Sequence, residues 1–205
     1  NKSIYMLHTF LHSLFPPGVF LPEGVVVQGD FSDTNWSPEA TATWHPTRHT
    51  TLYIAYKTGY KSGGFSNPSA LSANYADIDQ ARFGSETAEG GEIGAKGSFL
   101  NGRLSLNAAI YRYTFDGLQL SSFNAATTTF TIRNAASART TGAELEGNFV
   151  VNPELSLRGS VGYNHARYLS FPTSSCYAGQ TPAQGCVGGV QDLSGTPLTR
   201  APDLT

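Results

Sequence analysis

Much of this sequence alternates apolar and polar side chains with a period of two residues, which is the period of a β-strand. In TLYIAYKTGY, residues 51–60, one face carries Leu52 and Ile54, while the other carries Thr51 and Lys57. An amphipathic helix would instead repeat its apolar residues every three or four positions. The alternation therefore predicts strands with two chemically different faces.

Six segments share this alternation, and short links join them in pairs. They cover residues 37–46, 51–60, 86–100, 103–115, 139–151 and 155–168. The links within the pairs include PTRHT at 46–50, an Asn-Gly dipeptide at 101–102 and Asn-Pro-Glu at 152–154. Links this short join antiparallel strands, and Asn-Gly is a strong hairpin signal. We predict six antiparallel strands in three hairpins.

The links between the hairpins are much longer. They cover residues 61–85, 117–137 and 169–197, so all long links emerge at one end of the sheet and all tight turns at the other. Soluble domains have a median connection of about four to six residues and rarely sort their loops in this way. Short turns on one side and long loops on the other are typical of outer-membrane β-barrels.

The two faces of these strands differ in charge and in size. Charged residues within the strands share one parity: Glu39, Lys57, Glu92, Lys96, Glu144, Glu146 and Arg158. The other parity is aliphatic, aromatic or small, with many Ala and Gly residues that lipid tolerates because lipid fills the gaps. Arg112 breaks this rule near the loop end of its strand, where it can reach the membrane interface. We predict a lipid-facing side and a hydrated lumen side.

Tyrosines gather toward the loop ends of the strands, as in an outer aromatic girdle. They are Tyr56, Tyr60, Tyr111, Tyr113 and Tyr163. No run of 18 apolar residues exists, which excludes a transmembrane helix, whereas a transmembrane strand needs only about 9–11 residues. The net charge of −2 and pI near 6.2 give no basic footprint, so we expect no nucleic-acid partner.

The first residues follow a different pattern. Between residues 4 and 14 aliphatic side chains recur with helical spacing, and Pro16 and Pro17 would end such a helix. His8 and His12 are four apart, a spacing that binds metal on a helix, but no third ligand is evident. We assign no metal or cofactor.

Catalytic motifs are missing from the sequence, which contains no GxSxG, CxxC or phosphate-binding glycine loop. Glu144 and Glu146 share a strand face and could form a carboxylate pair, but a hydrated wall is the simpler interpretation. We assign no catalytic residue and predict that the protein is not an enzyme.

The two cysteines, Cys176 and Cys186, lie in one long link among Gly, Pro and Ser residues. In an oxidising compartment they would form a disulfide that stabilises this loop by roughly 2–3 kcal/mol. The alternative is a pair of free thiols.

Three ordered motifs carry a family resemblance. SPEATATWHPTRHTTLYIAYKTGYKSGGF is similar to a hairpin of TonB-dependent outer-membrane receptors, in which Ser-Pro opens one strand and a Tyr-rich strand ends in Lys-x-Gly-Gly-Phe. EIGAKGSFLNGRLSLNAAIYRYTFDGLQL and NAASARTTGAELEGNFVVNPELSLRGSVGYNHARY resemble the two hairpins that follow. The resemblance covers residues 36–168, and GTPLTRAPDLT at 195–205 resembles the start of the next strand.

The resemblance implies an all-β fold, an antiparallel transmembrane β-barrel segment of six or seven strands from a barrel of about 22. It implies residues 36–205 as part of that barrel in the outer membrane of a Gram-negative bacterium, with residues 1–35 an unassigned segment or an outer loop. The chain shows no plug domain and no TonB box, so we expect it to be an internal or C-terminal fragment.

The function that the resemblance implies is energy-dependent uptake of a scarce nutrient, most often a ferric siderophore. The partners would be outer-membrane lipid, the nutrient, and TonB acting through the plug. Aromatic and Arg residues of the long links are candidate ligand contacts: Phe65, Tyr75, Arg82, Phe83, Phe123 and Tyr177. Two alternatives remain open, a passive porin-like or adhesin-like barrel and a soluble β-sandwich binding module.

The two-solvent interpretation predicts that Ile54→Asp blocks membrane assembly far more than Lys57→Gln. A carboxylate facing lipid costs on the order of 2 kcal/mol, whereas a neutral amide in a hydrated lumen costs little. Heat-modifiable electrophoretic mobility of the membrane fraction measures assembly. Equal tolerance at the two positions would contradict the assignment of the faces, which also puts Gly63 and Gly64 outside the cell and residues 46–50 in the periplasm.

Overall fold

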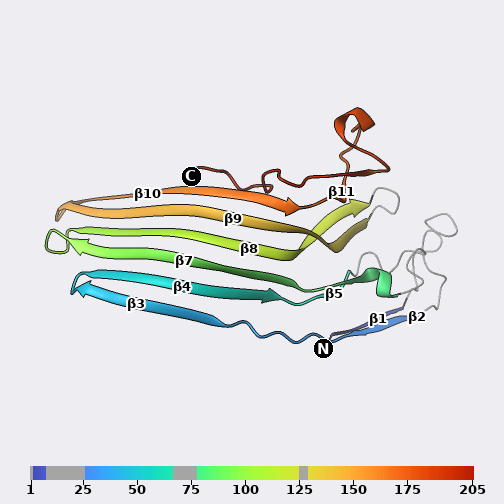
Figure 1. Cartoon of the computed structure of the whole chain (residues 1–205), viewed down its shortest axis with the longest axis horizontal. Coiled ribbons are helices and arrows are strands. Elements are labelled where there is room, and N and C mark those ends of the chain that lie inside the picture. The colour runs from blue at the N-terminus through green and yellow to red at the C-terminus, as the bar shows by residue number, and fades with distance from the viewer. Residues whose placement is uncertain (1, 8–25, 67–77, 125–128) are drawn as a thin grey trace.

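One six-stranded antiparallel sheet dominates the computed structural model, which describes residues 2–7, 26–66, 78–124 and 129–205 (Figure 1). The strands are β3 (Glu39–Thr47), β4 (Thr50–Lys61), β7 (Glu86–Phe99), β8 (Leu104–Asn124), β9 (Thr129–Asn152) and β10 (Leu155–Ser170). Their spatial order is β10-β9-β8-β7-β4-β3, so each strand pairs with its neighbour in sequence. The prediction of six strands in three hairpins is confirmed.

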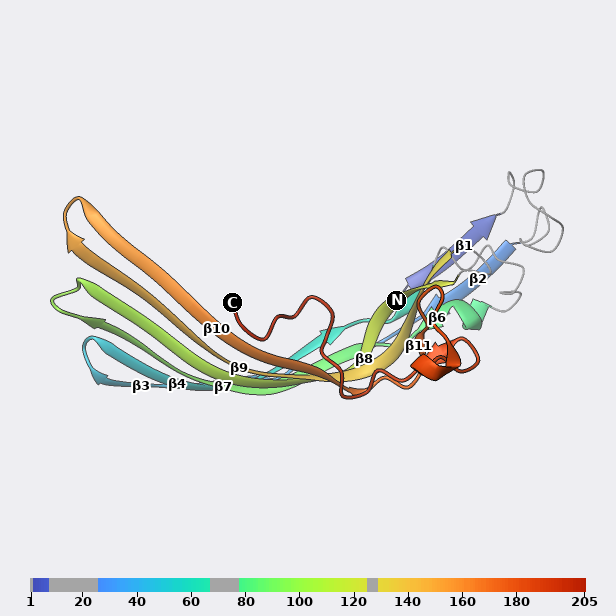
Figure 2. The ribbon, with the colours of Figure 1, turned by 90° about the horizontal axis from the view of Figure 1, so that it is seen from above.

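The sheet is a single curved layer rather than half of a sandwich (Figure 2). Within the described residues, the only other sheets are three two-stranded ones, β1-β2, β5-β6 and β11-β12. The soluble β-sandwich alternative is therefore wrong, because a sandwich needs a second sheet packed on the apolar face.

The register aligns large apolar side chains across the whole sheet. Ile54 pairs with Ile93, Ile93 with Ile110, Ile110 with Ala143, and Ala143 with Tyr163. All lie on one face, and the three isoleucines are 52–57% exposed. A sheet in water would bury such a row, whereas lipid solvates it directly.

The long link at residues 117–137 was predicted to be a loop, and this is wrong. Strand β8 continues to Asn124 and β9 begins at Thr129, so the two strands extend as a paired ribbon past the other strands. A register shift lies between Phe115 and Leu118, and Gly117 has a φ of +65° there. The ribbon bends away from the sheet near this end (Figure 2).

Small elements build the rest of the loop end. They are β1 (Lys2–Leu7), β2 (Val26–Phe31), β5 (Gly64–Phe65), η3 (Ile78–Ala81), β6 (Arg82–Phe83), β11 (Ser174–Ser175), η4 (Pro182–Gln184) and β12 (Val190–Gln191). The helix predicted from residue 4 is wrong over its first part, because those residues pair with β2 as a strand. His8 and His12 lie outside the described residues. No helix in the described ranges is long and apolar enough to cross a membrane.

The buried core also lies at the loop end. Ala138, Tyr168 and Phe171 are buried there, and Leu193 and Leu198 pack against them. This core holds the last residues of the chain beside β10, where they run antiparallel to it: Tyr168 N donates to Thr196 O at 3.0 Å and Gly162 N to Thr205 O at 2.9 Å. The expectation that residues 195–205 start another strand agrees with this pairing.

Tyrosine rings on the polar face lie over glycines of the neighbouring strand. Tyr53 is paired with Gly94, and Tyr111 with Gly142. Placing Tyr111 and Tyr113 in the outer aromatic girdle is therefore wrong, because both line the polar groove. A Cβ atom at either glycine would overlap the facing tyrosine ring. The glycines thus leave room for the rings to lie flat against the sheet wall.

We therefore expect Gly94→Val to destabilise the folded barrel by about 1–3 kcal/mol, because the new side chain must displace the Tyr53 ring. Gly159→Val is the matched control, since no atom lies within 4 Å of a Cβ placed at Gly159. The stability of both variants is measured by urea unfolding, with heat-modifiable electrophoretic mobility as the readout of the folded fraction. A Gly94 variant as stable as the Gly159 variant would show that the ring is not confined.

Candidate functional site

The polar face forms a groove of about 430 Å³ lined by charged and tyrosyl side chains. Tyr53 Oη donates a hydrogen bond to Glu92 Oε1 at 2.5 Å, and Lys96 Nζ lies 5.6 Å from the centre of the Tyr53 ring. Glu144 and Glu146 line the same groove from β9. Mixed charge with direct hydrogen bonds suits a hydrated lumen wall. No three His, Cys, Asp or Glu side chains of the described part of the chain could hold a metal ion.

Asn134 of β9 fastens three segments together at the loop end. Its Nδ2 lies 3.0 Å from Gly84 O, 3.0 Å from Ser85 O and 2.7 Å from Gly117 O, so its two hydrogens are shared among three carbonyl oxygens, and its Oδ1 accepts from Gly84 N. One amide thus satisfies backbone groups at the start of β7 and at the bend of β8. The regular ladder is interrupted here, so these backbone groups take side-chain partners instead; Gly84 O also accepts from Gln119 Nε2 at 3.0 Å.

The side chain of Gln119 in β8 likewise bonds backbone carbonyl groups, here in the segment that follows β4. Its Nε2 lies 3.1 Å from Ser62 O and 3.0 Å from Gly84 O, and its backbone N donates to Glu86 Oε2 at 2.9 Å. Gly63 next to it is packed too closely to carry a Cβ, which would meet Phe31 and Gly84. The Ser-Gly-Gly sequence is therefore a fixed junction between β4 and β5.

An aromatic and cationic cluster joins the N-terminal hairpin to the β5-β6 ribbon. The Arg82 guanidinium lies 5.6 Å from the ring centre of Phe65 and 5.9 Å from that of Phe31, and these two rings meet edge to face at 6.5 Å. Arg82 also pairs with Asp79 at 2.9 Å and donates to Asp30 O at 3.2 Å. The positive charge of this cluster is thus partly neutralised by its own loop.

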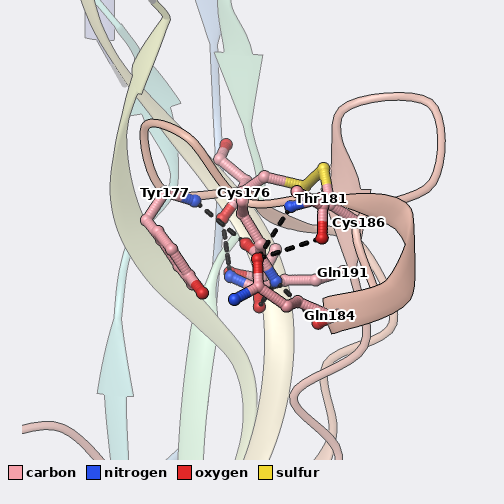
Figure 3. The surroundings of a disulfide bond; sticks show 9 residues. Cys176, Tyr177, Thr181, Gln184, Cys186 and Gln191 are labelled. Atoms are coloured by element: carbon pink, nitrogen blue, oxygen red, sulfur yellow. Dashed lines mark hydrogen bonds between the residues drawn. A yellow bond between two sulfur atoms is a disulfide. The ribbon is translucent and has the colours of Figure 1, made fainter.

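Cys176 and Cys186 are joined by a disulfide, with Cα atoms 5.8 Å apart (Figure 3). The ring that the disulfide closes contains η4, and the Thr181 amide donates to Gln184 Oε1 at 3.0 Å. Tyr177 projects from this lobe and is 58% exposed. The lobe is therefore held by local hydrogen bonds as well as by the covalent link.

Beyond the lobe, the chain returns to β10 through a turn at residues 192–194. Ser194 N donates to Asp192 Oδ1 at 2.8 Å. The hydroxyl and the amide of Ser194 lower the pKa of the Asp192 carboxyl, because both donate to its ionised form. The turn thus carries a negative charge at neutral pH.

The structure brings two of the six candidate ligand residues into contact. Phe65 and Arg82 contact each other, and Phe83 lines a neighbouring groove of about 390 Å³ with Lys61 and Gln119. Tyr177 lies on the disulfide lobe. Tyr75 is outside the described residues, and Phe123 is described only as backbone of β8.

Sequence reasoning missed Asn134 and Gln119, which organise this end of the molecule. Both lie in a segment whose sequence predicts a loop, and their partners are 17 to 58 residues away in sequence. A polar amide in such a segment carries no local signal of a structural role. Only the pairing of β8 with β9 brings it to these carbonyl groups.

The single sheet, with one apolar face, one polar face and all its large connections at one end, defines a segment of a transmembrane β-barrel. The family model for the TonB dependent receptor-like β-barrel matches residues 15–205. The chain therefore belongs to the TonB-dependent receptor family, whose members are receptors rather than enzymes. No curated protein matches the sequence.

Solved structures are similar at low sequence identity. The ferric yersiniabactin uptake receptor FyuA from Yersinia pestis has a TM-score of 0.59 and 21% identity, over 71% of this chain and 21% of that chain. The FrpB iron transporter from Neisseria meningitidis has a TM-score of 0.49 and 19% identity, over 71% of this chain and 21% of that chain. This chain thus spans about a fifth of the length of either structure, and the likeness to FyuA shows a shared fold.

The Asn134 contacts predict that Asn134→Leu loosens the loop end while the membrane sheet stays intact. The carbonyl groups of Ser85 and Gly117 lose their side-chain donor, and the Gly84 amide loses its acceptor. We expect this loss to cost on the order of 1 kcal/mol because the region is open to water. Hydrogen exchange of the peptide spanning residues 82–87 should become faster in the detergent-purified protein. Asn35→Leu is the control, since Asn35 bonds Ser37 in an exposed segment. Unchanged exchange in the Asn134 variant would contradict the role given to this amide.

Proposed function

We propose that the chain is part of an outer-membrane receptor of a Gram-negative bacterium that imports a scarce nutrient by an energy-dependent route. The observation that carries the proposal is the sheet of a TonB-dependent receptor family member, which has one apolar face, one polar face and its long connections at one end. In this arrangement the apolar face meets lipid and the polar face lines the passage. Residues 36–205 contribute to the barrel wall, Gly63 and Gly64 lie outside the cell, and residues 46–50 lie in the periplasm.

The nutrient class that we propose is a ferric siderophore. FyuA, whose fold this chain shares, is a ferric yersiniabactin uptake receptor, although the identity of 21% does not carry a particular ligand across. Ferric chelates are commonly anionic and aromatic, which suits a loop end with Arg and aromatic side chains. The proposed contacts are Phe65, Tyr75, Arg82, Phe83, Phe123 and Tyr177.

The N-terminal segment is proposed to be part of an outer loop. This is supported by the edge-to-face contact of Phe31 with Phe65 and by the hydrogen bond from Arg82 to Asp30 O. Both contacts tie β2 to the β5-β6 ribbon at the loop end. TonB would act on the receptor through a plug domain, which is a further part of the proposal.

Transport of ⁵⁵Fe tests the function directly. A strain lacking the complete gene, with and without a plasmid copy, is offered a ferric hydroxamate, a ferric catecholate and a ferric phenolate. We expect the plasmid copy to restore accumulation of one complex and a protonophore to abolish it by tenfold or more, because TonB relays the proton-motive force. Uptake that persists with the protonophore would instead indicate the passive porin-like alternative.

A further inference from the structure

Cationic side chains gather on the apolar face where the strands approach the loop end. The register places Arg112 two residues beyond Ile110 on the same face, with Thr141 opposite it and His165 opposite Thr141. One step nearer the loops, Arg139 of β9 lies directly opposite Arg167 of β10 and diagonally opposite Arg112. We name Arg112, Arg139, Arg167 and His165 the basic cluster.

Acidic groups nearby neutralise only part of this charge. Asp203 pairs with Arg167 at 3.2 Å, and Glu89, diagonal to Arg112, lies 3.5 Å from Tyr56 Oη. Arg112 is exposed and makes no ion pair within the described residues. Like charges placed directly opposite on neighbouring strands repel each other. Asp203 relieves this repulsion at Arg167, and a further anion near Arg112 and Arg139 would relieve the rest.

Arg139 adds an independent observation. Its Nε atom is shielded from solvent and has no hydrogen-bond partner among the described residues. A guanidinium nitrogen without a partner costs free energy, and none of the ion pairs within the described residues involves Arg139. The fork of an Arg side chain matches the oxygens of a phosphate group.

A groove of about 650 Å³ begins at the basic cluster and crosses the apolar face. Ile54, Ile93 and Ile110 line it from β4, β7 and β8, and Tyr163 lines it from β10. The small side chain of Ala143 leaves the space between Ile110 and Tyr163 open. Arg112 lines the loop end of this groove, so one site offers a cation and an apolar channel together.

We propose that this face binds one phosphorylated acyl lipid of the surrounding bilayer. Its phosphate lies between Arg112 and Arg139, and an acyl chain lies along the groove beside Ala143. A free phosphate would leave the groove empty, and an uncharged lipid would leave the guanidinium groups unpaired, so the amphiphilic anion alone satisfies both. The inference rests on the proposed membrane location but is independent of the transported nutrient.

Native mass spectrometry of the receptor, expressed from its complete reading frame and purified in detergent, tests the site. The probes are diphosphoryl lipid A, inorganic phosphate and a diacylglycerol. We expect retention of lipid A and of neither other probe. The double variant R112Q/R139Q should bind lipid A at least about tenfold more weakly, because each Arg near an anionic headgroup contributes to the binding free energy. Ala143→Leu, which fills the groove, should weaken retention while leaving every charge in place.

Arg158→Gln is the matched control, because Arg158 is paired with Asn148 on the polar face. It should retain lipid A as the wild type does. The site would be overturned if R112Q/R139Q retained lipid A as the wild type does, or if Arg158→Gln lost it equally. It would also be overturned if inorganic phosphate bound as strongly as lipid A, or if a dimer formed through this face. Recovery of the receptor outside the outer-membrane fraction would refute the proposed function, whereas a correctly located receptor that retains no lipid A refutes only this inference.

Discussion

The hydrogen-bond ladder between neighbouring strands is the interaction on which the whole molecule depends. In hydrocarbon no water can satisfy an unpaired backbone N–H or C=O, so each strand must be paired on both sides through the membrane. The meander from β3 to β10 does this with tight turns, and residues 196–205 continue the pairing along β10. Along the remaining edge, formed by β3, no strand of the described residues pairs, so further strands must cover it in a membrane.

Because the ladder holds the sheet together, the side chains of its two faces can contact two different solvents, lipid and water, and need not pack against a second protein layer. The isoleucine row is exposed because lipid replaces a protein core, and the polar face carries charged groups and tyrosines that cover glycines. Within the described residues, a hydrophobic core forms at the loop end, around Ala138 and Tyr168. Beyond this point β8 and β9 stay paired with each other, while the side-chain amides of Gln119 and Asn134 bond carbonyl groups of Gly84 and Gly117 that lie outside the regular ladder.

The membrane part of the fold was predictable because its signals are local. Alternation fixed the strand faces, and Asn101 and Gly102 adopt the positive φ values of 57° and 86° that an Asn-Gly turn favours. The extended β8-β9 ribbon was not predicted, because its Ser, Thr, Asn and Ala residues resemble a loop in composition. What makes it a ribbon is the pairing of each strand with the other. The helix predicted from residue 4 was wrong over its first part because a local signal was misleading there. The apolar residues have helical spacing, but the pairing of β1 with β2 makes this segment a strand.

By itself, then, the sequence determined the strand period, the chemistry of each face and the positions of the tight turns, because these depend on residues one or two positions apart. The tertiary structure decided what meets at the loop end. Asn134 reaches Gly84, the Arg82 cluster joins two hairpins, and Arg139 faces Arg167 only because one particular register aligns the strands. Register is a property of paired strands, and a shift of β9 by one residue would move Asn134 and Arg139 to the other face of the sheet.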